Sequence, residues 1–190
     1  MENIMKKKCL SVIISVVLSI SLTVPVLADE AEVTVSSGES ETHDSISTDK
    51  DTGADVDASN EKDPDGDHSE LEVKENVEVH STGEDGDPDT GIEVSAENDG
   101  NADVEVGGDV DVDAAGSDTA TGVDAEATSG GIIDFSAKGI NAESDTGGAR
   151  GIRAEASGGS SESFNIGTNG IKASGGAADG IEINSLSRLM

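Results

Sequence analysis

Apolar and polar residues alternate in short runs that recur through the second half of the chain. Six of these runs open with a glycine: GIEVSA at Gly91, GVDAEA at Gly122, GINAES at Gly139, GIRAEA at Gly151, GIKASG at Gly170 and GIEINS at Gly180. Period-two alternation places every second side chain on one face of an extended strand. The repetition of one short strand unit, separated by turn-forming sequence, predicts a repetitive all-β fold.

The alternation also predicts which side chains face the interior. In the Gly151 run, the apolar positions point inward while Arg153 and Glu155 point to solvent. Lys172 and Glu182 take the outward position in the later runs. The expected inward pairs are Ile152 with Ala154, Ile171 with Ala173, and Ile181 with Ile183.

Residues 91–190 are predicted to form a short parallel β-helix, or β-solenoid. Two strands of this kind, with their turns, occupy about 20 residues, which would give about five coils over this range. A solenoid folds with few apolar residues because each narrow coil needs only a few inward side chains. An antiparallel sandwich or meander of the same strands is the alternative fold.

Residues 29–90 are predicted to be an acidic, low-complexity linker or stalk that is weakly structured or disordered. AEVTVSS from Ala31 and ELEVKENVEVHS from Glu70 alternate well, but they are separated by sequence rich in Ser, Thr, Asp and Gly. Low apolar content combined with high net charge is typical of disordered chain.

Residues 1–28 have the three parts of a secretory signal peptide. Lys6-Lys7-Lys8 precedes an apolar stretch from Leu10 to Leu22, and Val26-Leu27-Ala28 offers small residues for cleavage before Asp29. The apolar stretch is short for a membrane span, so we expect no transmembrane segment after cleavage. The mature chain would lack cysteine, which favours bacterial export and a secreted or cell-surface location.

The charge is strongly negative and unevenly distributed. The chain has 41 acidic and 11 basic residues, a formal net charge of −30. Residues 29–131 hold 33 acidic and three basic residues, whereas residues 132–190 hold seven and five. Such a field repels nucleic acid and attracts divalent cations and basic partners, so DNA and RNA binding are excluded.

Two acidic turns are the candidate metal sites, and calcium is the candidate ion. Carboxylates alternate through DPDGD and through DGDPD, a spacing that suits a hard cation with several oxygen ligands. Neither turn completes an EF-hand loop, and diffuse acidic solvation is the alternative. The candidate ligands are Asp63, Asp65, Asp67, Asp85, Asp87 and Asp89.

Other side chains give no case for catalysis. His43, His68 and His80 are expected to be exposed polar residues, and no motif places a serine beside a base. The chain has no Trp or Tyr to form a sugar platform, and its strand carboxylates are too numerous to single out a catalytic pair. Asp109, Asp111 and Asp113 alternate with valines and are expected to form the solvent face of a strand. We predict no catalytic residue and no enzymatic activity.

The Gly-Ile-x-Ala phrases between Gly/Ser/Asp turns in residues 91–190 resemble those of repetitive parallel β-helix surface proteins of bacteria, the autotransporter-passenger and adhesin-like proteins. The leader resembles a Gram-positive signal peptide. The resemblance implies a secreted or cell-surface protein whose solenoid meets an extracellular protein or glycan surface. The chain departs from the pattern in having no sorting motif or membrane barrel, and its end directly after a repeat is also compatible with a truncated reading frame.

These observations support one leading hypothesis and two alternatives. The leading hypothesis is a non-catalytic structural or adhesin-like protein that presents a repetitive polar surface. The first alternative is an exported acidic protein whose folding is coupled to calcium binding, and the second is a disordered acidic exoprotein. Stacked repeats favour the leading hypothesis, because many weak contacts on a long surface add through avidity.

Overall fold

Every regular element in the described part of the chain is a β-strand. The computed structural model describes residues 32–59, 68–81, 88–116, 118–158 and 162–186. The predicted leader, residues 1–28, lies outside these ranges. The described strands are β1 (Val33–Val35), β2 (Ser40–His43), β3 (Ile46–Thr48), β4 (Thr52–Ser59), β5 (His68–Val73), β6 (Val77–His80), β7 (Asp89–Glu97), β8 (Asn101–Ala114), β9 (Ala120–Thr128), β10 (Ile132–Ser144), β11 (Gly148–Ser157), β12 (Ser163–Thr168), β13 (Ile171–Ser174) and β14 (Ala177–Leu186).

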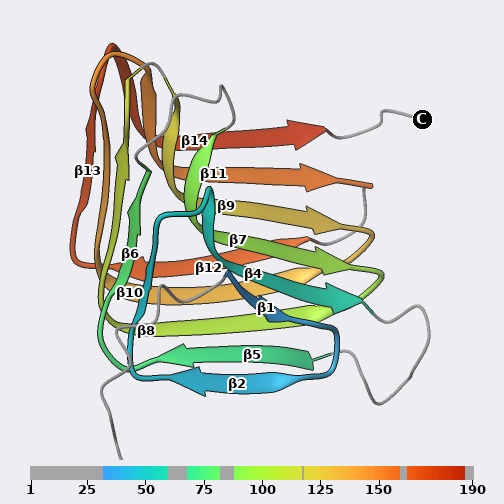
Figure 1. Cartoon of the computed structure of the whole chain (residues 1–190). Coiled ribbons are helices and arrows are strands. Elements are labelled where there is room, and N and C mark those ends of the chain that lie inside the picture. The colour runs from blue at the N-terminus through green and yellow to red at the C-terminus, as the bar shows by residue number, and fades with distance from the viewer. Residues whose placement is uncertain (1–31, 60–67, 82–87, 117, 159–161, 187–190) are drawn as a thin grey trace, which may run out of the picture.

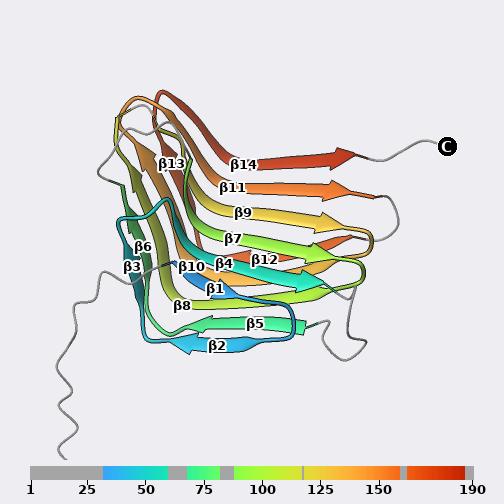
Figure 2. The same cartoon turned by 45° about the vertical axis from the view of Figure 1, so that its right-hand side comes forward.

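All described strand pairs are parallel, which confirms the predicted β-solenoid and excludes the antiparallel alternative. One sheet, here called face A, has the order β1-β4-β7-β9-β11-β14. The second sheet bends within β8 and β10 and so forms two further faces (Figures 1 and 2). Face B contains β2, β5, residues 101–106, residues 132–137 and β12; face C contains β3, β6, residues 109–114, residues 139–144 and β13.

One coil contains three strand segments and about 30 residues, not two strands and 20. Along face A the register pairs Ala54 with Ile92, Ile92 with Val123, Val123 with Ile152 and Ile152 with Ile181. These four steps advance by 38, 31, 29 and 29 residues, whereas the first step along face A, from Val33 to Ala54, advances by only 21. The predicted coil is too short because the alternation does not distinguish similar strands that lie on different faces.

The glycine-led runs separate into two sets in the structure. Those at Gly91, Gly122, Gly151 and Gly180 begin the same stretch of face A in successive coils. Those at Gly139 and Gly170 lie at the corner before face C, where Ile140 pairs with Ile171. The sequence similarity therefore reflects two corners of one coil.

The solenoid also starts earlier than predicted. Strands β1 to β6 lie between residues 33 and 80, in the region expected to be a linker or stalk, and they stack directly on the later coils. Apart from Glu41 and His43 in β2, their charged residues occupy outward positions, so a high charge density is compatible with a buried apolar column. Val56, Leu71 and Val77 are fully buried.

The core is a set of side-chain columns that run along the solenoid. On face B, Leu71, Val104 and Phe135 stack in register, and on face C Val77, Val110 and Ile140 do the same. All six are buried. Ile152 and Ala154 are also buried, as the alternation predicts. Side chains at one position of successive strands lie about 4.8 Å apart, which is close enough for van der Waals contact along each column.

Tight turns join face A to face B. Asn98 and Asp99 have φ values of 54° and 64°, and in the next coil Ser129 and Gly130 have 53° and 91°. The amides of Asn98 and Asp99 donate to the carbonyls of Thr128 and Ser129 in that coil. Asn, Asp and Gly accept the left-handed backbone more readily than other residues, which explains their use at this corner.

A glycine column occupies the corner between faces C and A. A Cβ placed on Gly53, Gly91, Gly122 or Gly151 would lie 2.6 Å from the carbonyl oxygen of the glycine in the following coil. At Gly122 the same Cβ would also meet the side chain of Ile140. Only glycine permits this close approach of the backbone to the next coil.

We predict that Gly122→Ala lowers the free energy of unfolding by about 1–3 kcal/mol, because the added methyl group overpacks a corner closed on two sides. Urea unfolding followed by circular dichroism measures the change. Gly180→Ala is the matched control, since a Cβ there meets nothing within 4 Å. It should leave stability unchanged or raise it by up to about 1 kcal/mol. Equal destabilisation by both substitutions would contradict the role assigned to the column.

Candidate functional site

The outer surface consists of side-chain columns with the same register as the core. Because alternate residues point outward, each strand contributes about two to four exposed side chains, and the next coil adds another set about 4.8 Å away. Many of these side chains are carboxylates, so acidic residues stack on acidic residues along the solenoid. The three faces differ in how these carboxylates are compensated.

Face A carries two neighbouring acidic columns. Asp55, Glu93 and Asp124 stack in one column, and Asp57 and Glu126 belong to the next. Partial burial, followed by the charges of Asp57, Glu93 and Glu32, raises the pKa of Asp55 to about 6. Burial, followed by the charges of Asp124 and Asp57, likewise raises the pKa of Glu93. Like charges at this spacing disfavour ionisation of their neighbours.

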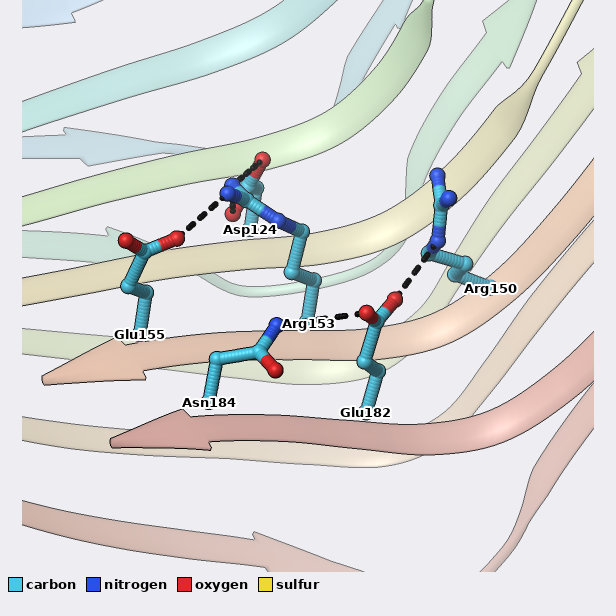
Figure 3. Close-up of polar contacts among 6 residues, drawn as sticks. All are labelled: Asp124, Arg150, Arg153, Glu155, Glu182 and Asn184. Atoms are coloured by element: carbon cyan, nitrogen blue, oxygen red, sulfur yellow. Dashed lines mark hydrogen bonds and ion pairs between the residues drawn. The ribbon is translucent and has the colours of Figure 1, made fainter. Parts of the chain in front are cut away.

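Arginine relieves this repulsion toward the C-terminal coils (Figure 3). Arg153 follows Asp124 in the first column; its Nη1 donates to Asp124 Oδ1 at 2.8 Å, and its Nη2 donates to Glu155 Oε2 at 2.6 Å. Asp124 in turn raises the pKa of Arg153. Arg150 Nε donates to Glu182 Oε2 at 2.8 Å. A hydrogen bond from the Asn184 amide and the nearby Arg150 lower the pKa of Glu182.

Face B carries carboxylates that form no ion pair with a described lysine or arginine. Glu70, Asp103 and Asp134 form one column, and Glu72 and Glu105 form the next. Within the described ranges, the ion pairs of Lys and Arg involve none of these five carboxylates. Weak hydrogen bonds from Ser40 and Thr42 reach Glu70 and Glu72 at 3.3 and 3.4 Å. Face B is therefore an acidic surface whose five carboxylates lack ion pairs with lysine or arginine among the residues that can be placed, although Lys74, which is paired with Asp44, also interacts with Glu72.

Face C balances its acidic residues with amides and a lysine. Asn141 Nδ2 donates to Asp111 Oδ1 at 2.6 Å, and Lys172 Nζ lies 3.5 Å from Glu143 Oε2. Asp109, Asp111 and Asp113 alternate with buried valines, which confirms that they form the solvent face of a strand.

A hollow of about 330 Å³ lies at the corner where faces B and C meet. Its walls combine hydroxyl, amide, lysine and carboxylate side chains, and none of the lining residues is a histidine or cysteine. Lys74 is paired with Asp44 at 2.7 Å. The lining residues are Ser45, Ile46, Ser47, Lys74, Glu75, Asn76, Glu78, Gly107, Gly108 and Lys138.

Of the predicted calcium ligands, the structure places Asp89 alone. Asp63, Asp65, Asp67, Asp85 and Asp87 lie outside the described residues. Asp89 is buried at the first position of β7, with 1% of its surface exposed, and its amide donates to the Thr119 carbonyl. Among residues that can be placed, no cluster of three or more His, Cys, Asp or Glu side chains could hold a metal ion. Calcium binding stays a prediction.

The histidines differ from one another in position. His68 and His80 are exposed, as predicted. His43 is not: it is in register with the buried Val73, and its Nε2 lies 2.9 Å from Glu41 Oε2. The sequence held a signal for this position, because SETH at Ser40 aligns with the alternating ELEV at Glu70 one coil later.

Comparison with known proteins gives no relative of this chain: no family model, no curated protein and no solved structure matches it. A search of the placed residues for a membrane-crossing helix also finds no candidate that is both long and apolar enough.

We predict that stability rises as the pH falls from 7.5 to about 5.5. Raised pKa values mean that the folded state binds protons more tightly than the unfolded chain. The stability gained from protonation of Asp55 and Glu93 is therefore present at low pH, and for Asp55 it is lost as the pH rises through about 6. Thermal unfolding should show a higher Tm at the lower pH. Asp55→Asn should raise the Tm at pH 7.5 and flatten this dependence.

Asp113→Asn serves as the matched control, because Asp113 is exposed on face C. It should leave the pH dependence of the Tm intact. A flattening of the same size in both variants would show that the net charge, and not the face A columns, sets the dependence.

Proposed function

We propose that the protein is an exported, non-catalytic structural or adhesive protein of bacteria that binds basic groups of an extracellular partner through its acidic faces. The observation that carries this proposal is face B, where five carboxylates stand in two columns and form no ion pair with a described lysine or arginine. An uncompensated, regularly spaced set of negative charges is complementary to lysine or arginine side chains, or to amino groups of a glycan.

The geometry supports binding by summed weak contacts. Each carboxylate on face B is solvent-accessible, so a single pairing with a cation would contribute little. Columns that repeat at about 4.8 Å allow several pairings at once on a flexible or polyvalent partner, and the combined affinity then exceeds that of any single contact. Nucleic acid and anionic membranes would be repelled by the same field.

The non-catalytic part of the proposal is supported by the arrangement of titratable groups. The carboxylates are distributed along extended faces instead of converging on one position. The corner hollow contains no histidine or cysteine among its lining residues. The proposal of export is supported by the basic, apolar and small-residue parts of residues 1–28, which lie outside the described structure.

We expect the purified protein to bind a poly-L-lysine surface, with binding that weakens as salt screens the charges. The triple variant Glu70→Gln, Asp103→Asn, Asp134→Asn should lower the affinity at least about tenfold, since it removes one whole column of face B. Surface plasmon resonance at several salt concentrations measures this effect.

The face C triple variant Glu78→Gln, Asp111→Asn, Glu143→Gln is the charge-matched control. Asp111 and Glu143 already have partners in the chain, so this variant should lose less than about threefold. Equal losses would mean that net charge alone drives binding and would count against a specific role of face B.

Expression with the complete leader in a Gram-positive host should release a product that begins at Asp29. N-terminal sequencing and intact mass of the protein in the medium provide the readout. Ala28→Trp should retain the leader, because the residue before the cleavage point must be small. A product that stays in the cells with Met1 or Met5 at its start would contradict export.

A further inference from the structure

In the last described coil, core-facing apolar side chains are exposed. Ile181 and Ile183 continue the columns of Ile152 and Ala154, yet they are 57% and 71% exposed, whereas Ile152 and Ala154 are 1% and 2% exposed. Together with side chains from faces B and C they line an apolar hollow of about 270 Å³. We call this surface the open end; its side chains are Phe164, Ile166, Ile171, Ala173, Ile181 and Ile183.

Unpaired backbone surrounds this apolar hollow. Among the described strands, β14 pairs only with β11, and β12 and β13 pair only with β10. Each of the three therefore presents one edge whose amide and carbonyl groups have no strand partner. An apolar centre with three free strand edges is the surface that each inner coil presents to its neighbour, and exposed edges of this kind favour pairing with another chain.

The opposite end of the solenoid also has free strand edges, on β1, β2 and β3, but it exposes no large apolar side chain among the described residues, because Val33, Val35 and Ile46 of the first coil are buried. On face B the core positions of the first coil are Glu41 and His43, which are paired with each other at 2.9 Å. On face C the corresponding position after Ile46 is Thr48, whose hydroxyl accepts from the Lys50 amide. On face A, β1 covers β4. An apolar open end does not match this surface, so stacking of one copy's open end on another copy's first coil is disfavoured.

Charge also favours contact at the open end. Residues 132–190 hold seven acidic and five basic residues, against 33 and three in residues 29–131. The basic residues near this end are paired with acidic ones, as in Arg150 with Glu182 and Lys172 with Glu143. Two strongly acidic copies therefore repel each other least when they approach through their last coils.

We propose that a second copy of this chain covers the open end, with the two open ends in contact across a twofold axis. The contact is self-complementary, since an apolar hollow meets the same apolar hollow, and the twofold relation brings β14 of one copy antiparallel to β14 of the other. The result is a closed dimer, because the polar first coil of each copy lies at the far end. The inference does not depend on the proposed binding of basic partners.

Sedimentation equilibrium of the purified 190-residue chain, over a wide concentration range, tests the inference. The expected result is a monomer–dimer equilibrium without larger species. Ile183→Lys should weaken dimerisation by about a hundredfold, since it places like charges in an apolar contact. Its far-UV circular dichroism should match the parent, because the side chain is already largely exposed.

Ile132→Lys is the matched control, since Ile132 is another exposed isoleucine, at the start of β10 on the side of the solenoid. This variant should dimerise like the parent. A monomer at every concentration would overturn the inference, as would a dimer unaffected by Ile183→Lys, which would indicate association through the leader or another surface. Masses that grow beyond a dimer would show head-to-tail stacking and would also overturn it.

Crosslinking locates the contact independently. In a chain with Cys9→Ser, Asn184→Cys should be joined to its counterpart by a flexible bismaleimide crosslinker, because the outward sides of the two β14 strands lie close together in the dimer. Thr34→Cys, on the exposed side of β1 at the opposite end, should give no crosslinked dimer under the same treatment. Crosslinking through Thr34→Cys in preference to Asn184→Cys would contradict contact between open ends.

Discussion

Register between successive coils is the constraint on which this molecule depends. The parallel backbone hydrogen bonds fix which residue lies beside which, and they bring Ile92, Val123 and Ile152 into one continuous apolar column. A slip of one residue would turn Arg153 inward and Ile152 outward. The interior is narrow, so a chain in which only 33% of residues are hydrophobic and 1% are aromatic still buries a complete core. The glycine column holds this register by allowing backbone to approach backbone at one corner.

The same register that stacks the core also stacks the charges. Carboxylates along faces A and B repeat with the coil, and on face A burial, followed by repulsion from acidic neighbours, raises the pKa of Asp55. Arg153 relieves part of that repulsion by bridging Asp124 and Glu155. On face B no described lysine or arginine does so. Carboxylates that are left unpaired are available to a partner, but their mutual repulsion lowers the stability of the fold.

Local alternation was enough to predict the strands, their inward residues and the parallel solenoid, but not the length of the coil. Gly139 and Gly122 open similar runs, although one lies at the corner before face C and the other begins its run on face A, and only long-range register separates them. The acidic composition of residues 29–90 predicts a stalk. Composition does not record that most charges between residues 33 and 80 fall on alternate, outward positions. The inward position of Glu41 and His43 becomes visible only when SETH is aligned with ELEV one coil later, and this alignment requires the coil length.

The unequal steps along face A bear on how such a protein changes over generations. The step from Ala54 to Ile92 is 38 residues and the step from Val123 to Ile152 is 29, yet both pairs occupy the same column. Additional residues enter only in the connections between strands, so the columns continue without interruption. A tandem duplication of about thirty codons would add one complete turn and lengthen both the core and its charged faces in proportion. The length of the solenoid can therefore change by mutation while the packing of its core stays the same.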